Sequence, residues 1–155
     1  MKARGFTLIE LVITVAIIAV LASVALPLNE LIVTRSKEQD LRRALRDIRD
    51  GIDAYKQAWD DGRLTKSAND SGYPKRLEDL VAGVEDQKSP RRERIYFLRR
   101  IPRDPFADES LAAAETWGKL SYPSPHDDPR AGDDVFDVYS LSTATGINGR
   151  PYKEW

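Results

Sequence analysis

The chain has 155 residues, of which 41% are hydrophobic and 32% are charged, and it contains no cysteine. This length predicts one modest domain in addition to a strongly apolar N-terminal segment, and the missing cysteines exclude disulfides and thiol chemistry. The formal net charge of −1 excludes a global electrostatic field that would attract nucleic acid or anionic lipid.

The first predicted element is an apolar run from Phe6 to Leu28, which follows a short leader that contains Lys2 and Arg4. About 20 helical residues cross a hydrocarbon core of ~30 Å, so this run is long enough to span a membrane. The positive-inside rule predicts that the leader stays in the cytoplasm and that the rest of the chain is exported. Glu10 breaks the pattern, because an unpaired carboxylate is unfavourable inside a bilayer.

Three interpretations of the apolar run are open. Ser23-Val24-Ala25 resembles a signal-peptide cleavage site, although the run is longer than a usual signal-peptide core. Alternatively, the run is a plain membrane anchor, which leaves Glu10 without a partner. In the third interpretation it is an anchor whose carboxylate is paired with a positive charge.

The stretch Gly5-Phe6-Thr7-Leu8-Ile9-Glu10 resembles the processing motif of type IV pilins and type II secretion pseudopilins. It combines a short basic leader, a Gly-Phe pair, a glutamate at the fifth position after the glycine and an uninterrupted apolar tail. The resemblance implies that a prepilin peptidase and methyltransferase cleaves between Gly5 and Phe6 and N-methylates Phe6. The apolar run is then retained in the mature chain.

This cleavage gives Glu10 a role in assembly. Cutting after Gly5 creates an ammonium at Phe6, four residues before Glu10 and therefore on a neighbouring helical turn. In a filament, Glu10 of one subunit can instead face the Phe6 ammonium of the next, since buried charges are tolerated only when they are paired. We therefore expect Phe6 and Glu10 to set the register between subunits.

The helical pattern resumes beyond Pro27. Apolar residues recur at alternating spacings of four and three, which indicates an amphipathic helix with a narrow stripe: Leu41, Leu45, Ile48, Ile52, Tyr55 and Trp59. We expect one long helix of about Phe6 to Asp61, kinked or locally opened at Pro27. We expect the stripe to face the core of the chain's own domain rather than a coiled-coil partner.

The remaining residues predict a small head domain. A short helix is expected at 75–81, followed by strands at 95–98, 117–122 and 135–141. A long helix followed by a few strands is typical of an α+β fold, here a long N-terminal helix packed against a small antiparallel β-sheet. The expected organisation is a leader at 1–5, a transmembrane and filament-core helix at 6–28, an amphipathic helix at 29–61 and a periplasmic globular head at 62–155.

Three motifs in the head are similar in order and spacing to those of the major pseudopilin of type II secretion: Leu98–Phe106, Trp117-Gly118 and Asp137–Ser140. The closing Gly149–Trp155 also resembles the tails of pseudopilin-like proteins. Major pseudopilins generally have an acidic calcium-binding loop after the strand that matches Asp137–Ser140. Here that loop, 141–149, has no carboxylate, although calcium prefers six to eight oxygen ligands that include carboxylates. We therefore expect no metal at this position and propose that Tyr152 and Trp155 hold the tail by burial.

Four aspartates in an acidic loop before that strand could supply calcium ligands instead, and a solvated acidic loop is the competing interpretation: Asp127, Asp128, Asp133 and Asp134. The single histidine, His126, has no second histidine or cysteine with which to form a nucleophilic or zinc site. We therefore expect neither a catalytic residue nor a cofactor.

The resemblance implies a structural subunit of a type II secretion pseudopilus, anchored once in the inner membrane with its C-terminal domain in the periplasm. The filament would drive protein export by extending. Implied partners are other copies of the chain, minor pseudopilins, the prepilin peptidase and the inner-membrane assembly platform, but no nucleic acid. The alternatives are a type IV or competence pilin for adhesion, motility or DNA uptake, and a secreted domain with a removed signal peptide.

Overall fold

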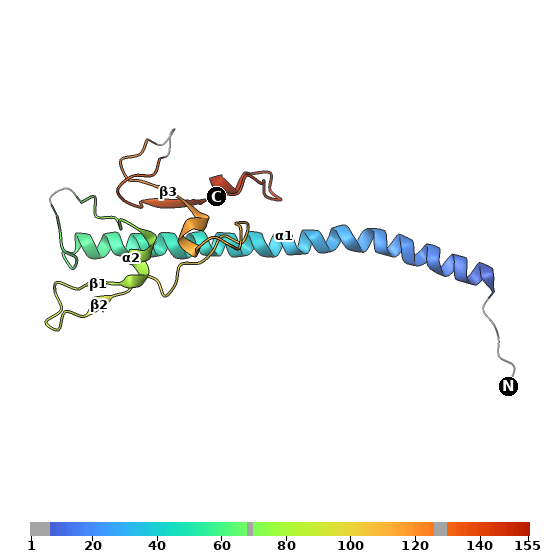
Figure 1. The fold of residues 1–155 in the computed structure, drawn as a ribbon, viewed down its shortest axis with the longest axis horizontal. Helices are drawn as coiled ribbons and strands as arrows, with labels where there is room; N and C mark the ends of the chain where they lie inside the picture. Colours follow the sequence, from blue (N-terminus) through green and yellow to red (C-terminus); the bar gives the residue numbers. More distant parts are fainter. Residues whose placement is uncertain (1–6, 68–69, 126–129) are drawn as a thin grey trace. The chain divides into compact units, whose positions relative to one another are not determined.

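The computed structural model describes residues 7–67, 70–125 and 130–155. The chain divides into two compact units, Met1–Ser36 and Lys37–Trp155. Figure 1 labels most of the elements, which in chain order are α1 (Leu8–Asp60), α2 (Leu77–Ala82), β1 (Val84–Glu85), β2 (Arg94–Ile95), the 3-10 helix η1 (Ala113–Thr116), β3 (Trp117–Leu120), β4 (Asp137–Ser140) and the 3-10 helix η2 (Tyr152–Glu154). The order of one long helix and then short strands confirms the predicted α+β class.

The first unit contains the N-terminal part of α1. The helix continues without interruption through Pro27, so the expected local opening at this residue is not present. Proline removes a single backbone donor from the helix, and the apolar helix-forming residues on both sides propagate the remaining hydrogen bonds. A single proline is therefore too weak a signal to end so long a helix.

The second unit begins with the C-terminal part of α1, and there the predicted stripe is buried. The exposed fractions of Leu41, Ile48 and Ile52 are 0%, 0% and 1%. These residues form one core with residues of α2, β3 and β4. Each such side chain contributes about 1.5–3 kcal/mol when it is removed from water. The stripe therefore faces the core of its own domain, as predicted.

The helix α2 closes one side of this core. Leu77 and Leu80 are both fully buried, as expected for the short helix predicted at 75–81. After α2, β1 and β2 pair in antiparallel fashion, with Val84 opposite Ile95. The prediction of a strand over 95–98 is wrong beyond Ile95, because the backbone N–H groups of Phe97 and Leu98 both donate to the carbonyl of Leu80, each at 3.0 Å.

The strands β3 and β4 form a second antiparallel pair, with Trp117 opposite Ser140 and Leu120 opposite Asp137. Val138 and Ser140 are completely buried, which identifies the inward face of β4. The described part of the head thus contains two separate two-stranded sheets rather than one sheet.

Candidate functional site

The N-terminus of α1 is closed by a capping box. The backbone N–H of Thr7 donates to Oε2 of Glu10 at 2.8 Å, and the backbone N–H of Glu10 donates to Oγ1 of Thr7 at 3.3 Å. The Thr7 hydroxyl also donates to the same carboxylate oxygen at 2.7 Å. These contacts satisfy backbone donors that the first turn of a helix leaves unpaired.

Sequence reasoning missed the contribution of Thr7. The signal was present, because Thr-x-x-Glu before an apolar run is a capping-box pattern. Glu10 therefore has hydrogen-bond donors within its own chain before any other subunit is considered. Gly5 and Phe6, the predicted cleavage and methylation residues, lie outside the described residues, so the predicted pairing of Phe6 with Glu10 stays a prediction.

The apolar face of α1 has no cover within the described part of its own unit. The large hydrophobic side chains at 8–21 and 28–33 are about half exposed or more. The helix is long and apolar enough to cross a membrane, and no residue in its most apolar stretch is buried. Such a large exposed apolar surface marks a region that lipid or another protein covers.

The predicted acidic loop does not form a metal site in the part that the structure describes. Asp127 and Asp128, like His126, lie outside the described residues. Asp134 is 7% exposed and accepts hydrogen bonds from the Ser121 hydroxyl at 2.7 Å and the Tyr122 backbone at 2.8 Å. Asp133 is exposed. Among the described residues, no group of three or more acidic, histidine or cysteine side chains could hold a metal ion.

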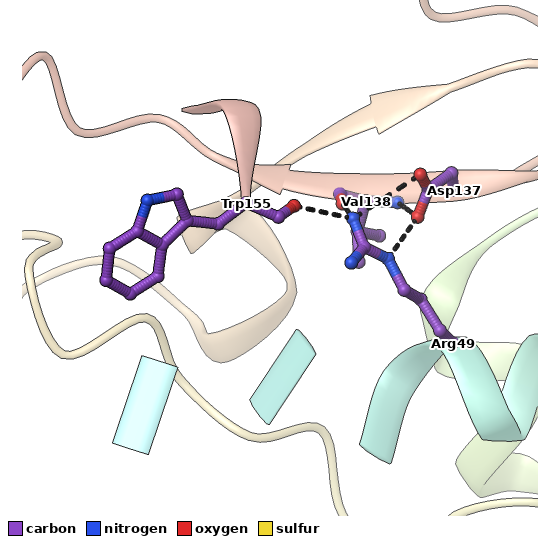
Figure 2. A network of polar contacts seen from close by, with 4 residues as sticks. All are labelled: Arg49, Asp137, Val138 and Trp155. Atoms are coloured by element: carbon purple, nitrogen blue, oxygen red, sulfur yellow. Dashed lines mark hydrogen bonds and ion pairs between the residues drawn. The ribbon is translucent and has the colours of Figure 1, made fainter. Parts of the chain in front are cut away.

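Arg49 connects α1 to β4 and to the end of the chain, and Figure 2 shows its contacts. Its Nε donates to Oδ1 of Asp137 at 2.7 Å. Its Nη2 donates to the main-chain oxygens of Val138 at 3.1 Å and Trp155 at 2.9 Å. One guanidinium thus binds a carboxylate and two main-chain oxygens that lie far from it in the sequence.

Glu38 forms a second contact between α1 and the C-terminal segment. Glu38 is only 6% exposed. Its Oε1 accepts hydrogen bonds from the Ile147 backbone N–H at 2.7 Å and the Tyr152 hydroxyl at 3.2 Å. Burial, reinforced by this hydrogen bond to the Glu38 carboxylate, raises the pKa of Tyr152. We call the contacts of Glu38 and Arg49 with residues 137–155 the C-terminal network.

Aromatic packing completes this region. The Tyr152 ring stacks on Phe106 with 4.2 Å between ring centroids, and it meets Trp155 edge-on at 5.0 Å. The Arg42 guanidinium lies 4.2 Å from the centroid of the Trp155 ring, within the range of a cation–π contact. Tyr152 is 2% exposed, so burial holds the tail at this residue as expected, whereas Trp155 is only partly buried.

Comparison with known proteins identifies the class. Residues 1–26 match the family model described as the prokaryotic N-terminal methylation motif. The chain therefore has the N-terminal motif of prokaryotic pilin-like proteins, which confirms the resemblance inferred from its leader.

The chain is similar, more specifically, to type II secretion system core protein G. It is 29% identical over 160 residues to this protein from Dickeya chrysanthemi, covering 96% of the chain and 95% of the relative. It is 28% identical to the Klebsiella michiganensis protein, over 90% of the chain and 94% of the relative. It is 27% identical to the Klebsiella pneumoniae protein, over 86% of the chain and 93% of the relative. No solved structure gives a significant match to the chain.

Proposed function

We propose that this chain is a structural subunit of a type II secretion pseudopilus and that extension of this filament drives protein export. One observation supports this most strongly: the similarity to core protein G, the major pseudopilin, extends over nearly the whole of both chains. This agreement favours the pseudopilus over a type IV or competence pilin. The missing cysteines agree with it, because adhesive pilins commonly close their C-terminal loop with a disulfide.

The exposed apolar part of α1 explains where the subunit is stored and how it assembles. Before assembly, the bilayer covers this surface, with the leader in the cytoplasm and the head in the periplasm. During assembly, the apolar helices of neighbouring subunits replace lipid and bundle in the filament core. The heads then coat the outside of the filament.

Processing at the leader prepares this transfer. Prepilin peptidase cuts between Gly5 and Phe6, and N-methylation follows at Phe6. The new ammonium belongs to the residue that directly precedes Thr7 in the sequence, and Thr7 itself donates hydrogen bonds to the Glu10 carboxylate. Pairing of Glu10 with the Phe6 ammonium of a neighbouring subunit then fixes the register, because an unpaired charge is strongly unfavourable in an apolar bundle.

The subunit works by assembly and has no catalytic role of its own. Its partners are other copies of the chain, the minor pseudopilins, the prepilin peptidase and the inner-membrane assembly platform. The head supplies the contact surfaces, and the N-terminal helix supplies the anchor and the filament core.

Deletion of the gene in its host tests this function. We expect secreted proteins to accumulate in the periplasm of the deletion strain and export to return when the intact chain is supplied. Overproduced chain should also form filaments that can be sheared from the cells and sedimented. Unchanged export in the deletion strain, together with lost adhesion, motility or DNA uptake, would support the type IV pilin alternative.

A further inference from the structure

The resemblance to major pseudopilins implies a calcium ion in the loop that follows β4, and the donor set of this chain does not fit it. The loop at 141–149 contains no aspartate or glutamate. The nearest carboxylate of β4, Asp137, is already engaged by the Arg49 guanidinium at 2.7 Å. Calcium prefers six to eight oxygens, and a fixed positive charge at this carboxylate repels a divalent cation.

We propose that the C-terminal network replaces the metal: Arg49 and Glu38, both on α1, hold the loop after β4 and the tail closed without calcium. This inference concerns how the head is held together, and it holds whether or not the filament proposal is correct.

The Arg49 guanidinium supplies the positive charge. It binds one carboxylate, from Asp137, and two main-chain oxygens, from Val138 and Trp155. Carboxylate and carbonyl oxygens are the ligands that calcium prefers, so a side-chain cation here satisfies the same kind of group. Because this positive charge belongs to a side chain of the protein, the contact needs no ion from solution.

The Glu38 carboxylate binds the loop directly. Ile147 donates its backbone N–H and Tyr152 its hydroxyl to one oxygen of Glu38. The donors therefore come from the loop and the tail and the carboxylate from α1, which is the reverse of a loop that supplies oxygens to a metal. Gly146 permits this approach, since a Cβ atom at this position would lie 2.5 Å from the Trp155 ring and 3.1 Å from Oε1 of Glu38.

Backbone groups of the loop also form hydrogen bonds with one another and with the start of the tail. Gly146 donates to the carbonyl of Arg150 at 2.9 Å, and Gly149 donates to the carbonyl of Gly146 at 2.9 Å. Thr145 and Pro151 form an isolated antiparallel bridge, and Tyr152 donates to the carbonyl of Ala144 at 3.1 Å. Within the loop, the carbonyls of Ala144 and Gly146 are thus engaged in protein hydrogen bonds.

Hydrogen exchange measured by mass spectrometry on the intact chain in detergent micelles tests the inference. We expect peptides from 141–155 to exchange at the same rate with excess calcium chloride and with a calcium chelator, and the thermal midpoint to be equal in both. Calcium-dependent protection of these peptides, or a midpoint that calcium raises and the chelator lowers, would overturn the proposal.

Two substitutions test the residues themselves. Arg49→Met and Glu38→Ala should each speed exchange in 141–155 by about tenfold or more, and calcium should not restore protection. Asp40→Asn and Arg43→Met, which remove an exposed ion pair of the same helix, are the matched controls and should leave the segment protected. If peptides from 141–155 exchange at the same rate in both network variants as in the controls, the proposed role of Glu38 and Arg49 is refuted.

Discussion

Glu10 and Glu38 are carboxylates of the same helix in opposite surroundings. Glu10 is exposed and accepts hydrogen bonds from Thr7 at the helix start, whereas Glu38 is buried and accepts them from the C-terminal segment. Both carboxylates have donors within the chain, which makes a charged group tolerable near apolar surface. Only Glu10 lies where a neighbouring subunit could compete for it.

Glu10 is the residue at which we expect assembly to fail first. Glu10→Gln and Glu10→Leu should leave membrane insertion intact, because the apolar run is unchanged. Both should reduce sheared filaments at least about tenfold, since an ammonium buried without its partner costs about 3–5 kcal/mol. Membrane fractionation and filament shearing measure the two effects.

The control for this experiment is Glu30→Gln, on an exposed part of the same helix, which should assemble normally. Normal filament yields from both Glu10 variants would show that the charge pair does not set the register.

The contacts of Asp86 predict how the stability of the head depends on pH in the acid range. The hydrogen bond from Arg63, with Nη2 2.6 Å from Oδ2, is the largest cause that lowers the pKa of Asp86, and the backbone N–H of Lys88 adds to it. Because the pKa is lower in the folded chain, the stabilisation is complete above the ordinary aspartate value of about 4 and is lost as the pH falls through the folded value.

We therefore expect Asp86→Asn to lower the thermal midpoint of the head at neutral pH and to have progressively less effect below about pH 4. Thermal unfolding of the intact chain, followed by circular dichroism at several pH values, measures this. Asp47→Asn, an exposed position on α1, is the control and should not change the midpoint in a pH-dependent way. A difference between Asp86→Asn and the natural chain that is constant from neutral pH to acid would contradict the assignment.

At the scale of elements, α1 was predictable because its apolar residues follow the helical period over a long stretch. The strand expected at 95–98 was mostly wrong, although its residues favour strands. Phe97 and Leu98 bond instead to the end of α2, which is a tertiary contact that no local pattern reveals. The two residues of β1 are too few to show any period.

The C-terminal network could not be predicted for a related reason. Glu38 and Ile147 are 109 positions apart, and a single sequence does not indicate which distant polar residues meet. The capping box of Thr7 and Glu10 differs, because its spacing of three residues is a local signal that could have been used. Sequence reasoning thus identified the long periodic element and failed where one long-range contact decides the structure.

The buried stripe of α1 gives a stability prediction for this element. Ile48→Ala should destabilise the head by about 2–5 kcal/mol, because the residue is completely buried and its removal leaves a cavity. Ile32→Ala, at an exposed apolar position of the same helix, should leave the unfolding of the head unchanged. Urea denaturation followed by tryptophan fluorescence compares the two, and equal midpoints would show that the stripe is not the core.

At the scale of the whole molecule, charge is unevenly distributed along the chain. Basic residues predominate from Lys88 to Arg103, and acidic residues predominate from Asp104 to Asp137. Arg99 and Arg100 are exposed. Complementary patches of this kind can orient neighbouring heads, since weak contacts of under ~1 kcal/mol repeat at every subunit.

We expect a double charge reversal, Arg99→Glu with Arg100→Glu, to make filaments more sensitive to salt and to reduce their yield. Lys153→Glu, a reversal at an exposed residue of the tail, is the control. Sedimentation of filaments over a range of salt concentrations measures the effect. If filaments of the double variant survive high salt as well as natural filaments do, charge pairing between heads does not orient the subunits.

In the function proposed here, the apolar part of α1 is retained in the mature subunit, which has a processed N-terminus. This is tested by the intact mass of the chain purified from the inner membrane of a host that has its prepilin peptidase, with fragmentation of the N-terminal peptide. We expect a mature chain that begins at N-methylated Phe6. A chain that begins at Leu26, without the apolar run, would contradict it.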